Sequence, residues 1–97
     1  MFVNWTYPAV RDLEIIGAYI RQDSRDAAHR VLTEIFTAVE SLSSLPNRGR
    51  LGRLSDTREL VLTPSPYIAV YRVLSQEVRI LRIRHAARKW PYRSAPE

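Results

Sequence analysis

Two spacings of apolar residues divide the chain into a helical first half and an extended second half. Apolar side chains recur every three or four residues over 8–22 and again over 23–45, which is the spacing of one helix face. Pro8 suits the first turn of the first helix, Asp23–Asp26 supplies capping oxygens for the second, and Pro46 ends it. The pattern therefore predicts two consecutive helices that form an antiparallel hairpin.

The apolar stripe of the first helix contains a glycine. Its members are Val10, Leu13, Ile16, Gly17 and Ile20. Because glycine in a helix interior costs about 1 kcal/mol relative to alanine, we expect Gly17 to permit a close approach of the second helix.

Four segments have the β-branched and aromatic composition of strands. They cover residues 2–6, 57–63, 67–73 and 77–84. The last three are joined by short turns, so they are expected to be antiparallel neighbours. The order β-α-α-β-β-β predicts one α+β domain over 1–97, an antiparallel sheet with the helix hairpin on one face and a flexible tail at 91–97.

The sheet is expected to be apolar on both faces, although one hairpin covers only one of them. Strict alternation places Val78 and Ile80 on one face, and Leu81 and Ile83 on the other. The second face is edged by arginines, namely Arg72, Arg82 and Arg84. Such a face usually meets a partner or the tail of its own chain.

Charge separates the two halves further. The 97 residues carry a net charge of +5, and 14 of the 15 cations are arginine. Residues 1–47 contain four arginines and six acids, for a net charge of −2, whereas 48–97 contain eleven cations and four acids, for +7. A basic half of this kind indicates a nucleic acid or an acidic protein as partner.

Composition excludes several classes of protein. The chain has no cysteine and two histidines, so disulfides, thiol nucleophiles and a structural metal site are not expected. No apolar run approaches the ~18 residues of a membrane span, and no signal-peptide pattern opens the chain. We expect a cytoplasmic protein without a cofactor.

Five stretches together resemble the RelE/ParE superfamily of bacterial type II toxins over nearly the whole chain. They read WTYPAVRDL, LSSLPNRGRLGR, TRELVL, PYIAVYRV and VRILRIRHAARKWP. The resemblance implies a βααβββ toxin in a hetero-oligomer with its cognate antitoxin. The acidic C-terminal segment of that small antitoxin would wrap the toxin and shield its basic surface.

The superfamily contains two mechanisms. RelE-like members cut mRNA in the ribosomal A site, whereas ParE-like members poison DNA gyrase by protein binding. RNA cleavage needs a base, an acid and cations for the developing phosphorane charge. Glu59 and Val61 stand where RelE-like nucleases place basic residues, and Ile68 stands where they place an arginine. The resemblance therefore favours a ParE-like gyrase poison, with a ribosome-dependent mRNA endonuclease as the alternative.

The candidate site residues follow from this choice. A nuclease would use His85, Arg88 and Arg58. Binding of the antitoxin or target is expected at Arg48, Arg50, Arg53, Arg72, Arg82, Arg84 and Trp90. Structural readings remain open beside these: His85 could shape the strand exit, Arg58 could pair with a nearby acid, and Trp90 could be a lid over the sheet edge.

Overall fold

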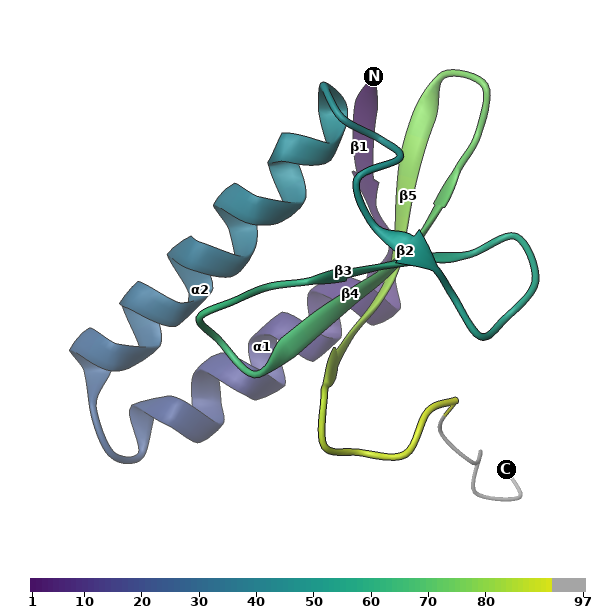
Figure 1. The fold of residues 1–97 in the computed structure, drawn as a ribbon. Helices are drawn as coiled ribbons and strands as arrows, with labels where there is room; N and C mark the ends of the chain where they lie inside the picture. The colour runs from purple at the N-terminus through teal and green to yellow at the C-terminus, as the bar shows by residue number, and fades with distance from the viewer. Residues whose placement is uncertain (92–97) are drawn as a thin grey trace.

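The computed structural model describes residues 1–91 and contains the expected succession of helices and strands (Figure 1). The predicted tail at 91–97 lies outside this range except for Pro91. The elements are β1 (Phe2–Trp5), α1 (Tyr7–Arg21), α2 (Arg25–Glu40), the 3₁₀ turn η1 (Ser41–Ser43), β2 (Arg50–Leu51), β3 (Arg58–Val61), β4 (Tyr67–Val73) and β5 (Glu77–His85). The α+β class is confirmed. The two-residue strand β2 is additional to the four strands expected from the sequence.

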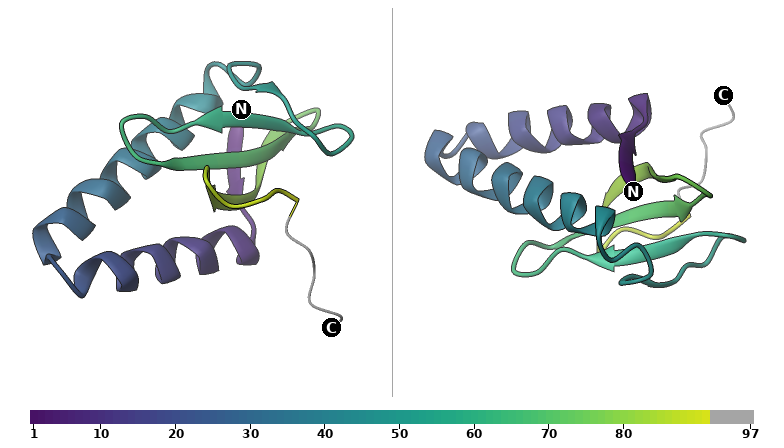
Figure 2. Two further views of the ribbon diagram at one scale, coloured as in Figure 1. Left: turned by 60° about the horizontal axis from the view of Figure 1, so that its bottom comes forward. Right: turned by 90° about the horizontal axis from the view of Figure 1, so that it is seen from above.

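The five strands form one mixed sheet in the order β1-β5-β4-β3-β2. Strands β2 to β5 pair antiparallel as expected, whereas β1 runs parallel to β5, with Val3 opposite Val78. The helix hairpin lies on one face of this sheet, and its turn projects beyond the strands (Figure 2). The sheet therefore has an inner face against the helices and an outer face opposite them.

Caps and a glycine position the hairpin. The Thr6 side chain accepts the Ala9 N–H at the start of α1, and the Ser24 side chain accepts the Ala27 N–H at the start of α2. A methyl group at Gly17 would lie 2.9 Å from Leu32 Cδ1 of α2, which agrees with the expected close approach.

Two expectations for the helices are wrong. Val10 is exposed, because Ala9, Asp12, Ile16 and Gly17 form the buried side of α1 instead. The α2 helix does not continue to Leu45, which is exposed. It ends at Glu40 and tightens into η1, where the Ser41 hydroxyl donates to the Ala38 carbonyl.

A β-bulge changes the predicted alternation of β5. Val70 pairs with Arg82 while Tyr71 pairs with Ile80, so Leu81 is the extra residue between them. The extra residue reverses the phase of the strand, and Ile83 joins Ile80 in the buried inner core instead of facing outward. The expectation that Ile83 lies on the outer face is therefore wrong, because strict alternation fails at a bulge.

Candidate functional site

A buried carboxylate organises the outer face of the sheet. Glu59 is 3% exposed and accepts hydrogen bonds from Arg50 Nη2 at 3.1 Å, the Arg53 backbone N–H at 3.3 Å and Arg84 Nη2 at 3.3 Å. Burial by itself raises the pKa of the Glu59 carboxyl, but these three hydrogen bonds and the Arg84 charge outweigh it. The pKa therefore lies below its ordinary value, and Glu59 is ionised at neutral pH.

The C-terminal segment, residues 86–90, covers part of this face. Trp90 is 6% exposed, and Arg84 lies over its ring with Cζ 5.6 Å from the ring centroid. Arg53 Nη1 donates to the Trp90 carbonyl at 2.8 Å. The geometry supports the reading of Trp90 as a lid, and it places Arg84 beneath the surface, at 3% exposure. The chain's own C-terminal segment thus occupies part of the face that the sequence left uncovered.

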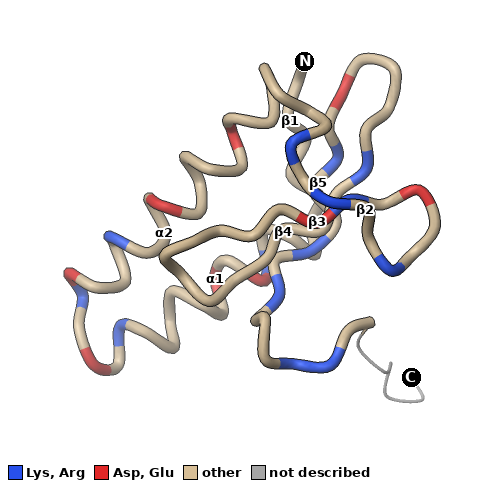
Figure 3. The backbone as a smooth tube through the Cα atoms, in the orientation of Figure 1, with Lys and Arg blue, Asp and Glu red and all other residues tan. Residues whose placement is uncertain are grey.

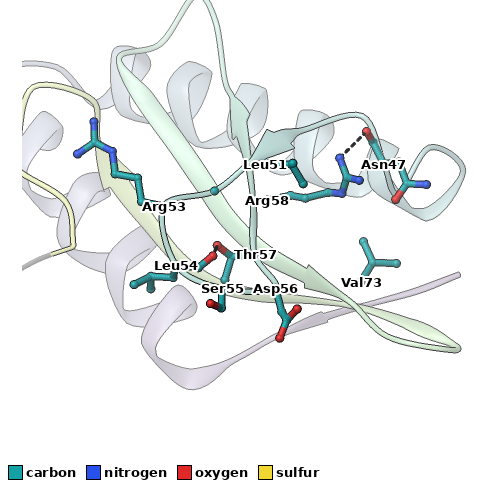
Figure 4. A pocket seen from close by; sticks show the side chains of 10 residues that line it. Asn47, Leu51, Arg53, Leu54, Ser55, Asp56, Thr57, Arg58 and Val73 are labelled. Carbon is teal, nitrogen blue, oxygen red and sulfur yellow. Dashed lines mark hydrogen bonds between the residues drawn. The ribbon is translucent and has the colours of Figure 1, made fainter.

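The loop between β2 and β3 borders an open pocket of about 570 Å³ (Figure 4). Arg58 and Arg53 line it from different sides. Arg58 Nη1 donates to the carbonyls of Asn47 at 3.3 Å and Gly49 at 2.8 Å, so its guanidinium is occupied by the backbone rather than by an acid. The buried Tyr71 hydroxyl receives the Gly49 N–H, and burial raises its pKa.

Basic residues predominate over the strands and the C-terminal segment, while the helices carry both signs of charge (Figure 3). Arg72 is exposed and stands opposite Arg79 in the β4–β5 register, a pairing of like charges that is unfavourable. Glu77 compensates Arg79 at 3.0 Å, and no ion pair in the described part of the chain compensates Arg72. Arg48 is exposed in the segment between η1 and β2 and donates to the Ser41 hydroxyl.

A groove of about 870 Å³ opens between the helix hairpin and the end of β5. Its lining is mainly apolar and includes Tyr19 and Tyr67 together with three basic residues, Arg82, His85 and Arg88. Arg82 forms a bidentate pair with the carboxylate of Asp12 at 2.7 and 3.0 Å. The sequence-predicted residues are thus divided between this groove, the outer sheet face and, for Arg48 and Arg58, the segment between η1 and β3.

His85 has a defined environment within the groove. Its ring meets Tyr67 edge-on, with centroids 5.3 Å apart, and its Nδ1 accepts the Ala87 N–H at 3.0 Å. A neutral histidine that accepts at Nδ1 carries its proton on Nε2. The Nε2 N–H can therefore donate a hydrogen bond, but Nδ1 offers no free lone pair for a general base while it accepts the Ala87 N–H.

Comparison with known proteins identifies the family. Residues 3–90 match the family described as the ParE toxin of the type II toxin–antitoxin system parDE. The chain belongs to the ParE toxin family. It is 51% identical over 89 residues to toxin Y4kP of Sinorhizobium fredii, covering 92% of each chain. It is 48% identical over 86 residues to toxin RelE2 of Caulobacter vibrioides, covering 89% of this chain and 96% of the relative.

Two solved structures share the fold of this ParE-family chain. The chromosomal ParDE system from P. aeruginosa superposes with a TM-score of 0.79 at 30% identity, covering 88% of this chain and 95% of that one. A copper-bound mutant toxin from Helicobacter pylori superposes with a TM-score of 0.55 at 18% identity, covering 88% and 93%, and shows the fold alone. Membership of the family implies an antitoxin as partner.

The structural roles of two acids in this ParE-family toxin, Glu59 and Asp12, were not predicted from the sequence. The sequence suggests Glu59 as a residue unsuited to a nuclease site and as one candidate ion-pair partner of Arg58, but its partners in the structure are Arg50 and Arg84. Asp12 shares the buried face of α1 with Ala9 and Ile16, at helical spacing, and that position was the available signal. Its carboxylate binds Arg82 and also accepts the Ile83 N–H at 2.9 Å.

Residues 1–91 provide two further observations. None of their helices combines the length and the apolar character that crossing a membrane requires. They also contain no group of three or more His, Asp or Glu side chains placed to hold a metal ion.

Proposed function

We propose that this ParE-family toxin arrests bacterial growth by binding DNA gyrase, through its basic outer sheet face and C-terminal segment, and not by cleaving RNA. The observation that carries the proposal is the buried, ionised Glu59 at the centre of that face. Arg50 and Arg84 already share its charge. Because both guanidinium groups are bound to this carboxylate, they are less available to neutralise the developing charge of a phosphorane.

The remaining nuclease positions support the same reading. Ile68 is buried and Val61 is an exposed apolar side chain, so neither can neutralise a phosphorane. His85 lacks the lone pair of a general base while its Nδ1 accepts the Ala87 N–H. The surface suits the docking of a protein better than the breaking of a phosphodiester.

A ribosome-dependent mRNA endonuclease is the second candidate, and the groove is the observation that favours it. Arg82, His85 and Arg88 line the groove together with the phenol of Tyr67. Asp12 offsets the charge of Arg82, which leaves Arg88 and His85 as the basic groups for such chemistry.

One side-by-side experiment separates the two candidates. Purified toxin is titrated into gyrase supercoiling and cleavage assays and, in parallel, into a translation reaction in which the mRNA is mapped for cuts. We expect gyrase inhibition with intact mRNA. Cuts in translated mRNA that fall about 10²-fold in Arg88→Ala, with gyrase unaffected, would establish the endonuclease instead. Arg30→Ala, which removes an exposed charge from α2, is the matched control.

We also propose that the antitoxin is a small protein whose acidic segment neutralises the outer face. A carboxylate of the partner would bind most favourably at Arg72, because Arg72 faces Arg79 without a compensating acid among residues 1–91. Arg72→Glu is expected to weaken antitoxin binding far more than Arg30→Glu in a titration at low salt. Equal effects of the two reversals would contradict this placement.

A further inference from the structure

Three segments that are distant in sequence meet at Glu59. The β2–β3 loop reaches it through the Arg53 N–H, β5 reaches it through Arg84, and both arginines hold Trp90. Arg53 Nη1 donates a hydrogen bond to the Trp90 carbonyl, and Arg84 lies over the Trp90 ring. One carboxylate therefore ties the loop, the last strand and the C-terminal segment into a closed cycle of contacts.

We propose that Arg53, Glu59 and Arg84 are positioning residues that hold residues 86–90 in the conformation that the target of the toxin recognises. This inference rests on the proposed function, in which the C-terminal segment contacts the target. Within that segment Arg88 and Lys89 are exposed beside the buried Trp90, so the lid fixes the place of two cations at the surface.

The chemistry of the cluster explains why Glu59 is needed. Arg84 is buried, and its Nε has no hydrogen-bond partner among the described residues, so Glu59 supplies the compensation for its charge. A buried guanidinium without its carboxylate turns toward water, because an uncompensated buried charge is costly. Loss of Glu59 would thus move the Arg84 guanidinium away from the Trp90 ring that it contacts.

Arg53 and Arg84 can be tested separately from the rest of the fold. Arg53→Ala removes the hydrogen bond to the Trp90 carbonyl but keeps the backbone N–H that donates to Glu59. Arg84→Lys keeps a charge near Glu59 but removes the planar face over the ring. Arg84 is too buried to touch a partner, so a loss of potency in Arg84→Lys does not reflect a lost contact between Arg84 and the target.

The experiment measures amide hydrogen exchange in the full-length toxin, together with gyrase inhibition and growth arrest. We expect exchange at the hydrogen-bonded amides of Ala86 and Arg88 to accelerate roughly tenfold or more in both variants, the scale of one charge-assisted hydrogen bond, while Ile35 in α2 is unchanged. Potency should fall about tenfold in parallel. Arg53→Lys should recover part of both effects, and Arg30→Ala should alter neither.

Three results would overturn the inference. Unchanged exchange at 86–90 would show that the cluster does not hold the segment. Faster exchange with full potency would show that binding to the target does not depend on the position of residues 86–90. Loss of potency in Arg53→Ala but not in Arg84→Lys would show that Arg53 contacts the target directly. If the wild type leaves gyrase untouched, the proposed target fails, and growth arrest still decides whether positioning matters.

Discussion

Replacing Asp12 by alanine tests how the free edge of β5 is closed. Strand β1 pairs with β5 only as far as Ile80, and the edge beyond it is not covered by another strand among residues 1–91. There the Asp12 carboxylate accepts the buried Ile83 N–H at 2.9 Å and forms a bidentate pair with Arg82. A residue of α1 thus takes the place that a strand residue would fill.

The magnitude follows from these contacts. A buried N–H left without an acceptor costs about 1–3 kcal/mol. The Arg82 side chain is 34% exposed and can be hydrated after the loss, so the ion pair contributes about 1 kcal/mol more. We expect Asp12→Ala to lower the free energy of unfolding by about 2–4 kcal/mol, which corresponds to roughly 10–25 °C in Tm for a domain of this size.

Asp12→Asn and Arg82→Ala separate the two parts of this effect. Asparagine retains a neutral acceptor for the Ile83 N–H, and Arg82→Ala keeps the Asp12 carboxylate as that acceptor but removes the ion pair, so each should cost about 1 kcal/mol. Urea unfolding followed by circular dichroism measures all three variants, and unchanged m-values would confirm intact two-state behaviour. The edge-capping argument is refuted if Asp12→Asn destabilises as much as Asp12→Ala, or if Asp12→Ala costs less than about 1 kcal/mol.

Three further predictions concern the β2–β3 region. Gly49→Ala places a methyl group 2.7 Å from the Tyr71 hydroxyl and 2.9 Å from the Glu59 carbonyl oxygen; it should cost about 1–3 kcal/mol in urea unfolding, more than Gly17→Ala, where a Leu32 methyl can move aside. Tyr71→Phe leaves the Gly49 N–H without its acceptor and should cost about 1–3 kcal/mol by the same assay, a reading that an unchanged midpoint would contradict. Because the pKa of Glu59 is lowered on folding from the ordinary 4.5, its contribution is present above that value and is lost as the pH falls through the folded value. Glu59→Gln should therefore flatten the loss of stability as the pH falls below the ordinary value of 4.5, and an unaltered acid profile would argue against the charged cluster.

Hydrophobic spacing was sufficient for the order of elements and for the helix hairpin. Helix caps, prolines and turn residues are local signals, so α1, α2 and the strand β4 could be placed from the sequence. The family could likewise be recognised from motifs such as VRILRIRHAARKWP, and the match over residues 3–90 confirms it. These features depend on neighbours in the chain, which is why sequence reasoning reaches them.

Contacts between distant segments decided the rest. The bulge at Leu81 depends on how β5 meets β4, and it moved Ile83 from the predicted outer face into the core. The parallel pairing of β1 with β5 arises only when the helix hairpin has returned the chain to the far edge of the sheet. A short-range pattern contains no record of such partners.

The candidate site divides in the same way. Its arginines could be selected from charge alone, because their number and their position in the second half are properties of the chain itself. Their roles depend on where a carboxylate from elsewhere in the fold happens to lie, since an ion pair forms by proximity in space. Glu59 holds Arg84 beneath Trp90, whereas Arg72 receives no such partner within residues 1–91 and stays exposed.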